Sequence, residues 1–154
     1  MFQSILLVCV GNICRSPTAE YLLRQRLPAA RATVSSAGLG AVEDSPMDAI
    51  AAALLREHGI DGGAHRGRQL LPDMLRQADL VLVMEKAHAA RIARVAPEAS
   101  GKVFLLGKWQ GEREIPDPYG QSRPAFEHVY ALIDQGVSHW LPYLYASPPG
   151  VSAA

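Results

Sequence analysis

Cys9 and Arg15 stand near the amino terminus with five residues between them, one of which is Gly11. The apolar run at 5–8 is typical of a buried strand, and residues 18–27 carry leucines at helical spacing. A loop that joins a strand to a helix in this way can turn successive backbone N–H groups toward one anion, with Gly11 as its flexible point. The helix N-terminus adds unpaired N–H groups and the positive end of its dipole. The segment therefore predicts a phosphate-binding loop with a thiol at its base.

The thiol of Cys9 is the candidate nucleophile. Thiols beside cations and helix N-termini ionise more readily, so Cys9 is expected to be largely thiolate at neutral pH. Arg15 offers a planar, permanently charged fork that can hold two phosphoryl oxygens as charge develops on them. Ser16 is predicted to cap the following helix, Pro17 to occupy its first position and Glu20 to place a favourable charge in its first turn. The alternative is a buried cysteine after an apolar strand and an arginine that only caps a surface loop.

A second candidate group, Asp117, lies about a hundred residues further along the chain. If Cys9 removes a phosphoryl group from an ester, an acid is needed as well, because expulsion of an alkoxide or phenoxide is slow unless the leaving oxygen receives a proton. Pro116 and Pro118 flank Asp117 and hold its carboxyl group on a stiff, exposed loop. After phosphoryl transfer to Cys9, the same carboxylate could activate the water that hydrolyses the thiophosphate. By itself, the segment is equally compatible with an ordinary proline-rich turn.

These two segments resemble a known family. Residues 9–20 resemble the signature of the low-molecular-weight protein tyrosine phosphatases, and residues 115–119, Ile-Pro-Asp-Pro-Tyr, resemble the acid loop of the same family. The segments at 35–40, 65–69 and 80–85 are also similar to family segments, so the resemblance spans nearly the whole chain. Several of them are most similar to bacterial members associated with capsule and exopolysaccharide tyrosine kinases.

The resemblance implies that four polar residues support the loop. In the family, residues that hydrogen-bond around the phosphate loop hold its strained backbone and stabilise the thiolate. Their positions match four residues of this chain: Asn12, Ser16, Ser36 and His65. Such residues orient the groups that touch the substrate. Without the resemblance, Ser36 would be assigned to packing at a strand end and His65 to a surface loop.

The pocket wall bears on substrate choice. Leu39 and Tyr119 match family positions that flank the substrate ring, and a deep loop between apolar walls favours phosphotyrosine over phosphoserine. Ile13 is similar to the isoleucine of the tyrosine phosphatases, whereas related arginine phosphatases carry threonine there. Leu39 stands where many eukaryotic members have tryptophan, and Gly120 where they often have a second tyrosine, so their aryl specificity and loop phosphorylation do not carry over. The residues expected to contact substrate are Val10, Gly11, Asn12, Ile13, Cys14, Ser16, Leu39 and Tyr119.

The resemblance also implies a monomer that acts on a phosphotyrosine protein. The expected partner is a bacterial tyrosine autokinase that drives polysaccharide export. Cys14 adds a redox hypothesis, because a second thiol in the curled loop could capture the sulfenic acid of oxidised Cys9 as a reversible disulfide. The alternative is that Cys14 is a small, buried apolar residue.

Composition limits the remaining possibilities. With 154 residues, 49% of them hydrophobic, the chain can bury one core, and a single domain over 1–146 with a frayed tail at 147–154 is expected. The balance of 15 basic and 15 acidic residues gives no footprint for nucleic acid or an anionic membrane. Because the amino-terminal segment lacks a signal-peptide pattern and is too short to span a bilayer, a cytoplasmic location is expected. Only two cysteines occur, both in the loop, so no four-ligand zinc pattern is present, and the histidines outside the family segments lack a ligand spacing. No metal and no other cofactor are expected.

Strand-like and helix-like segments alternate along the chain. Short apolar or β-branched runs occur at 5–9, 33–36, 80–84 and 103–106, and helical patterns at 18–27, 46–58, 72–78, 86–96 and 124–145. This alternation predicts one doubly wound α/β domain, with a four-stranded parallel sheet and helices on both faces. In such sheets the ligand lies at the carboxyl ends of the strands, where the predicted phosphate loop follows the first strand.

Four other functions are compatible with parts of the pattern. Thioredoxin-linked arsenate reductases have a similar loop, but they relay a disulfide through further cysteines, and none follows Cys14. A phosphocysteine carrier of the sugar phosphotransferase kind would explain Cys9 but not Arg15 together with Asp117. A phosphotyrosine-binding module without activity would have no use for Asp117. A protein arginine phosphatase is disfavoured by Ile13.

Overall fold

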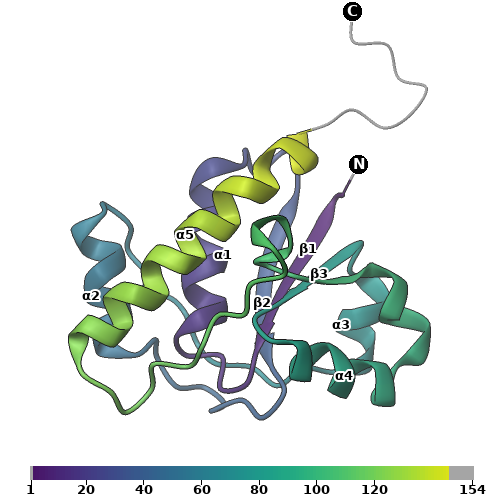
Figure 1. Cartoon of the computed structure of the whole chain (residues 1–154), viewed down its shortest axis with the longest axis horizontal. Helices are drawn as coiled ribbons and strands as arrows, with labels where there is room; N and C mark the ends of the chain where they lie inside the picture. The colour runs from purple at the N-terminus through teal and green to yellow at the C-terminus, as the bar shows by residue number, and fades with distance from the viewer. Residues whose placement is uncertain (1, 146–154) are drawn as a thin grey trace, which may run out of the picture.

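Four parallel strands form the sheet of the computed structural model, which describes residues 2–145 (Figure 1). Their order in the sheet is β2-β1-β3-β4, so β1 has a neighbour on each side. All the pairings are parallel, and the carboxyl ends of the strands therefore meet at one edge, the lower edge in Figure 1. The strands are β1 (Ser4–Cys9), β2 (Thr33–Gly38), β3 (Leu80–Val83) and β4 (Val103–Leu105).

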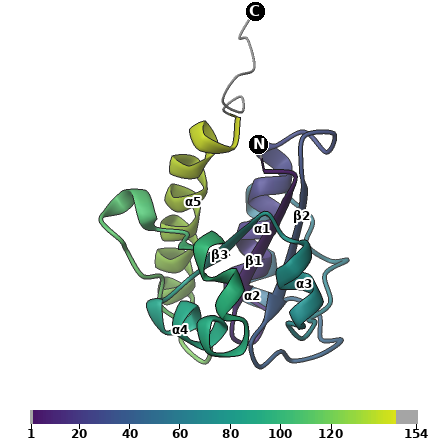
Figure 2. The same cartoon turned by 90° about the vertical axis from the view of Figure 1, so that its right-hand side faces the viewer.

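Helices cover both faces of the sheet. Helices α1, α2 and α5 pack on one face and α3 and α4 on the other, and Figure 2 views the molecule from the α3 and α4 side. The helices are α1 (Arg15–Arg26), α2 (Ala49–Glu57), α3 (Pro72–Gln77), α4 (Lys86–Val95) and α5 (Arg123–Tyr145), with short 3-10 helices η1 (Pro97–Lys102) and η2 (Lys108–Gln110). The predicted doubly wound α/β fold with four parallel strands is confirmed.

The alternation of side chains along β1 divides the core in two. Ile5 and Leu7 pack into the cluster of α1, α2 and α5, whereas Leu6 and Val8 pack into the cluster of α3 and α4. All four side chains are buried, as expected for a parallel strand covered on both faces. The loop that follows β1 therefore starts from a strand that is held from both sides.

Three element boundaries differ from the prediction by more than one residue. Helix α1 starts at Arg15, three residues early, and β2 extends two residues further, to Gly38. Helix α2 starts at Ala49 rather than at residue 46, because the side chain of Asp48 accepts the N–H groups of Ile50 and Ala51 as an N-cap. The other boundaries differ by at most one residue, which is the usual uncertainty of helix and strand ends.

The single domain over 1–146 stays a prediction, and the predicted tail at 147–154 lies outside the described residues. Between residues 2 and 145, no helix is both long and apolar enough to cross a bilayer. Over the same residues, no three His, Cys, Asp or Glu side chains gather in a way that could hold a metal ion.

Gly38 ends β2 at the point where this strand touches the loop after β1. A Cβ atom at Gly38 would lie 2.3 Å from the carbonyl oxygen of Val10 and 3.0 Å from the Cβ of Asn12. Because the closest of these atoms belongs to the backbone, it has little freedom to move aside. Only glycine therefore allows β2 and the loop to approach this closely.

We expect Gly38→Ala to lower the free energy of unfolding by about 1–3 kcal/mol, the usual cost of overpacking a rigid site. Urea denaturation of the variant and the parent protein measures this difference. Gly101→Ala is the control, because a Cβ at Gly101 meets nothing within 4 Å. Equal unfolding free energies for the two variants would contradict the expected clash.

Candidate active site

The loop after β1 turns its carbonyl groups outward. The carbonyl oxygens of residues 9–11 accept N–H groups of the 39–42 segment at 2.9–3.0 Å, and those of residues 12–14 accept from His65, Asp48 and Thr18. In a trans peptide the carbonyl group and the following N–H point in opposite directions, and the described residues contain no cis peptide bond. The N–H groups of residues 10–15 therefore face the inside of the loop, as an anion-binding nest requires.

Helix α1 begins as soon as this loop closes. Cys14 occupies the N-cap position and Arg15 is the first helical residue, so the predictions that Ser16 caps the helix and that Pro17 begins it are wrong. The carbonyl of Cys14 accepts hydrogen bonds from both the backbone N–H and the hydroxyl of Thr18, which fixes the first turn. No side chain caps the helix, and its first N–H groups stay available to an anion.

Asn12, rather than Gly11, is the residue of the loop with a left-handed backbone. Its φ angle is 57°, whereas Gly11 is not among the residues with positive φ. Asparagine tolerates this conformation better than most residues, but the conformation still costs free energy unless its surroundings hold it. The left-handed turn is therefore made by Asn12 and depends on its partners, and the expectation that Gly11 supplies the flexible point stays a prediction.

Four hydrogen bonds fix Asn12. Its side-chain amide donates to the hydroxyl oxygens of Ser16 at 2.8 Å and Ser36 at 2.9 Å. Its side-chain oxygen accepts the backbone N–H of Arg68 at 2.9 Å, and its backbone carbonyl accepts from Nε2 of His65 at 2.6 Å. Asn12, Ser16, Ser36 and His65 are all buried. The structure thus brings together the four polar residues that the family resemblance assigned to loop support.

Glu20 continues this network away from the loop. The hydroxyl of Ser36 donates to Glu20 Oε1 at 2.5 Å, and Arg24 Nη2 lies 2.6 Å from Glu20 Oε2. Glu20 is buried and lies beyond the first turn of α1, so the prediction that it places a favourable charge in that turn is wrong. Because Ser36 commits its hydrogen to Glu20, its oxygen is free to accept from Asn12. The carboxylate therefore fixes the direction of the hydrogen bonds that reach the loop.

Cys9 lies at the base of the loop with its Sγ 2.9 Å from the Ser16 hydroxyl oxygen. That oxygen already accepts the Asn12 amide, so its own hydrogen can point at the sulfur. Cys14 is also buried, and burial raises the pKa of its thiol, which is protonated at neutral pH. Thiolates rather than thiols attack oxidised sulfur, so this burial works against the redox hypothesis for Cys14, which stays a hypothesis.

Arg15 is buried and held by two groups that the sequence analysis did not assign to the site. Its Nη1 donates to Glu85 Oε2 at 2.5 Å and to the backbone carbonyl of Ile115 at 2.9 Å. Its Nη2 lies 3.7 Å from Asp117 Oδ2. Within residues 2–145, Nε and Nη2 of Arg15 make no hydrogen bond. One side of the guanidinium is thus fixed, and donors remain for an oxyanion.

Glu85 could have been found from its position, since it follows β3 closely at the carboxyl edge of the sheet, where ligands bind. His88 completes its surroundings: Nδ1 accepts the backbone N–H of Glu85 at 3.2 Å, and Nε2 lies 3.3 Å from Glu85 Oε2. Burial, aided by the positive charge of Arg15, lowers the pKa of His88. Because the imidazole is neutral, the negative charge of Glu85 is balanced by Arg15.

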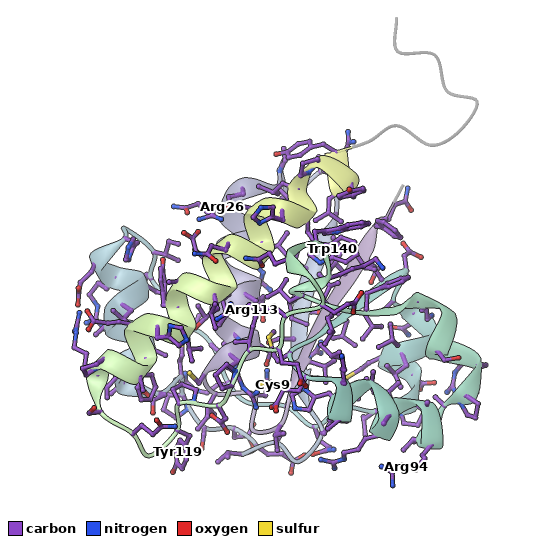
Figure 3. All side chains as sticks on the ribbon, viewed as in Figure 1. Cys9, Arg26, Arg94, Arg113, Tyr119 and Trp140 are labelled. Atoms are coloured by element: carbon purple, nitrogen blue, oxygen red, sulfur yellow. The ribbon has the colours of Figure 1, made fainter. Side chains whose placement is uncertain are left out.

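Asp117 and Tyr119 form the rim of a pocket above Cys9. The pocket has a volume of about 270 Å³ and is lined by residues 9–15, Gly40, Val42, Asp117 and Tyr119. Asp117 Oδ1 accepts the backbone N–H of Tyr119 at 3.0 Å, and the Asp117 side chain is about half exposed at 51%. Figure 3 shows Tyr119 and Cys9 toward the carboxyl edge of the sheet. Nucleophile, cation and carboxylate therefore share one pocket.

Leu39 does not line this pocket. Its side chain contributes to a neighbouring groove against α3 and α4, while Gly40 and Val42 of the same segment face the loop. Gly40 and Val42 were not predicted from the sequence, because nothing in their residue types distinguishes a pocket wall from a surface turn. The expected contact of Leu39 with the substrate ring stays a prediction.

Comparison with known proteins identifies close relatives. The family model for low molecular weight phosphotyrosine protein phosphatase matches residues 4–147. The low molecular weight protein-tyrosine-phosphatase Wzb of Salmonella typhimurium is 49% identical over 146 residues, covering 95% of this chain and 97% of that protein. The low molecular weight protein-tyrosine-phosphatase Etp of Escherichia coli K12 is 48% identical over 139 residues, covering 90% and 93%.

Solved structures similar to this chain include a relative named Wzb and a protein named as an arginine phosphatase. Wzb of Vibrio vulnificus, in complex with benzylphosphonate, has a TM-score of 0.89 and 45% identity, covering 93% of this chain and 99% of that one. YwlE arginine phosphatase from Geobacillus stearothermophilus has a TM-score of 0.79 and 34% identity, covering 95% and 99%.

The Asn12 network predicts that Ser36→Ala lowers the free energy of unfolding by about 1–3 kcal/mol, since it removes one hydrogen-bond partner each from the buried Glu20 carboxylate and the buried Asn12 amide. Ser35→Ala is the matched control, because Ser35 adjoins Ser36 in β2 and makes no side-chain hydrogen bond within residues 2–145. Chemical denaturation of both variants measures the difference. If both unfold at the same denaturant concentration, the network does not stabilise the fold.

Proposed function

Because the chain belongs to the low molecular weight phosphotyrosine protein phosphatase family and is a protein tyrosine phosphatase of the Wzb and Etp type, we propose that it works through a cysteinyl phosphate on Cys9. The observation that carries the proposal is the shared pocket of Cys9, Arg15 and Asp117. A nest of N–H groups suits a bound phosphate dianion, and the Ser16 hydroxyl can stabilise the thiolate beneath it.

In the first step, the Cys9 thiolate attacks phosphorus in line with the tyrosine oxygen. The S–P bond forms as the P–O bond breaks, and its electron pair goes to the leaving phenolic oxygen. Asp117 gives that oxygen a proton, which avoids release of a phenolate. Arg15 and the loop N–H groups hold the equatorial phosphoryl oxygens, where the transition-state charge is spread.

In the second step, water attacks the phosphorus of the cysteinyl phosphate. The Asp117 carboxylate takes the proton of the water, the S–P bond breaks, and its electron pair returns to Cys9 as a thiolate. Inorganic phosphate leaves, and the acid and the thiolate are restored for another turnover. The position of Asp117 on the pocket rim, close to the mouth, suits both transfers.

The proposed substrate is phosphotyrosine in a protein. Cys9 is buried at the base of its pocket, so a long aryl group reaches the sulfur more readily than the short side chain of phosphoserine. The relative from Vibrio vulnificus binds benzylphosphonate, whose ring and phosphorus resemble those of phosphotyrosine. Arginine phosphatase is the second candidate, favoured by the likeness to the protein from Geobacillus stearothermophilus but at lower identity.

The proposed partner is a bacterial tyrosine autokinase that controls exopolysaccharide or capsule production. This assignment rests on the likeness to Wzb and Etp and on the family segments in the sequence. We also propose that the protein acts as a cytoplasmic monomer.

Removing the nucleophile tests the mechanism. Cys9→Ser is expected to lower phosphate release from a phosphotyrosine peptide by more than about 10⁴-fold, because a hydroxyl is a far weaker nucleophile than a thiolate at neutral pH. Binding of inorganic phosphate should persist, since it uses the loop N–H groups and Arg15. Matched phosphoserine and phosphoarginine peptides should release no phosphate with the parent protein. Faster release from phosphoarginine would favour the second candidate, and release by the serine variant would refute the cysteinyl intermediate.

Removing the acid should matter most for poor leaving groups. We expect Asp117→Asn to lower kcat by about 10²-fold for phenyl phosphate and much less for p-nitrophenyl phosphate, whose leaving group departs without a proton. Steady-state kinetics over a series of aryl phosphates measures the dependence. Asp61→Asn, an exposed carboxylate outside the pocket, is the control. An equal loss of kcat across the series would show that Asp117 is not the acid.

A further inference from the structure

A second depression lies beside the Cys9 pocket. It has a volume of about 360 Å³, larger than that of the Cys9 pocket, and it runs between the 39–42 segment and the two helices α3 and α4. Its lining is mostly apolar, with Leu39, Leu75 and Ile92 among the side chains. The mechanism proposed above makes no use of this groove.

The groove and the Cys9 pocket share one wall. Leu39 lines the groove and the adjacent Gly40 lines the pocket, so the two spaces are separated by about one residue of chain. Gln69 fixes this wall, because its Nε2 donates to the Leu39 carbonyl and its Oε1 accepts the Ala41 N–H, both at 2.9 Å. The Leu39 N–H in turn bonds to the Cys9 carbonyl. Whatever fills the pocket is thus held at a fixed position next to the groove.

Two apolar side chains that line the groove are exposed to water. Leu71, just before α3, is 53% exposed, and Val95, at the end of α4, is 69% exposed. Single exposed apolar residues are common, but these two line the same apolar groove and add to its apolar surface, and such surface marks interaction sites.

The charged side chains that line the groove are all basic. Arg91 and Arg94 on α4 line it, and no Asp or Glu does. Neither arginine forms an ion pair with any of residues 2–145. Both are exposed, so their long side chains can follow a ligand at the rim. The groove therefore suits a ligand with an apolar side chain and a nearby carboxylate.

We propose that the groove binds the substrate polypeptide next to its phosphotyrosine, with an apolar side chain against Leu71 and Val95 and an acidic side chain at Arg91 and Arg94. This inference rests on the proposed function. Figure 3 shows Tyr119 and Arg94 on the same edge of the molecule, with Cys9 between them in that view. Since an extended chain advances about 3.3 Å per residue, an anchor within a few residues of the phosphotyrosine reaches the groove.

Charge reversal at the rim tests the inference. The readout is kcat/KM for a phosphotyrosine peptide divided by kcat/KM for phenyl phosphate, which fills only the Cys9 pocket. The peptides carry a Leu-Glu pair that is moved from four residues before to four residues after the phosphotyrosine. At the best position, Arg91→Glu/Arg94→Glu should lower the ratio by about tenfold, as expected for two exposed ion pairs turned into repulsions. Replacing Glu by Lys in that peptide should restore the ratio for the variant.

Two controls separate this inference from the proposed function. Arg56→Glu on α2 reverses an exposed arginine outside the groove and should leave the ratio unchanged. Val95→Ser probes the apolar half of the groove and should lower the ratio only for peptides that contain the leucine. If the parent protein hydrolyses phosphotyrosine but the ratio does not respond to the groove variants or to the peptide position, the inference is refuted. If the parent hydrolyses no phosphotyrosine, the proposed function fails instead. Dimerisation that Arg91→Glu/Arg94→Glu abolishes would overturn the inference in favour of a second copy of the chain.

Discussion

The site depends on one strained backbone unit, the left-handed peptide at Asn12. This residue lies at the middle of the loop, and its conformation sets the direction of the N–H groups on either side. Strain of this kind persists only where the surroundings hold it, and here both the side chain and the carbonyl of Asn12 are bonded to other segments. The phosphate-binding geometry is therefore built before any ligand arrives, and little ordering remains to be done on binding.

The charges of the site are arranged around a buried cation. Arg15 would be costly to bury alone, and Glu85 and the Ile115 carbonyl offset that cost on one side of its guanidinium. His88, which is neutral, also contacts the Glu85 carboxylate and adds no second positive charge to the site. Asp117 lies more exposed at the rim, where its proton can exchange with water. Fixed cation and accessible carboxylate thus have separate environments, as their proposed roles require.

The sequence predicted the fold and the order of the site because both depend on local patterns. Apolar runs located each strand, and Cys9 and Arg15 mark the ends of the loop by their spacing. Glu85, Gly40 and Val42 were missed because their roles depend on segments that meet only in the folded chain. The capping role predicted for Ser16 was wrong for a related reason: helix α1 starts at Arg15 because the loop closes on Cys14, and Ser16 contacts Cys9 instead of capping the helix.

The 39–42 segment holds the loop through backbone hydrogen bonds: its N–H groups donate to the outward carbonyl oxygens of the loop, and its side chains take no part in those bonds. Evolution can therefore replace these side chains without dismantling the catalytic loop. Related proteins can diverge in substrate preference through single substitutions here, while the chemistry at the sulfur stays intact. Substitutions in the 39–42 segment, which forms the wall between the two depressions, can therefore change which partners bind with little effect on the catalytic rate.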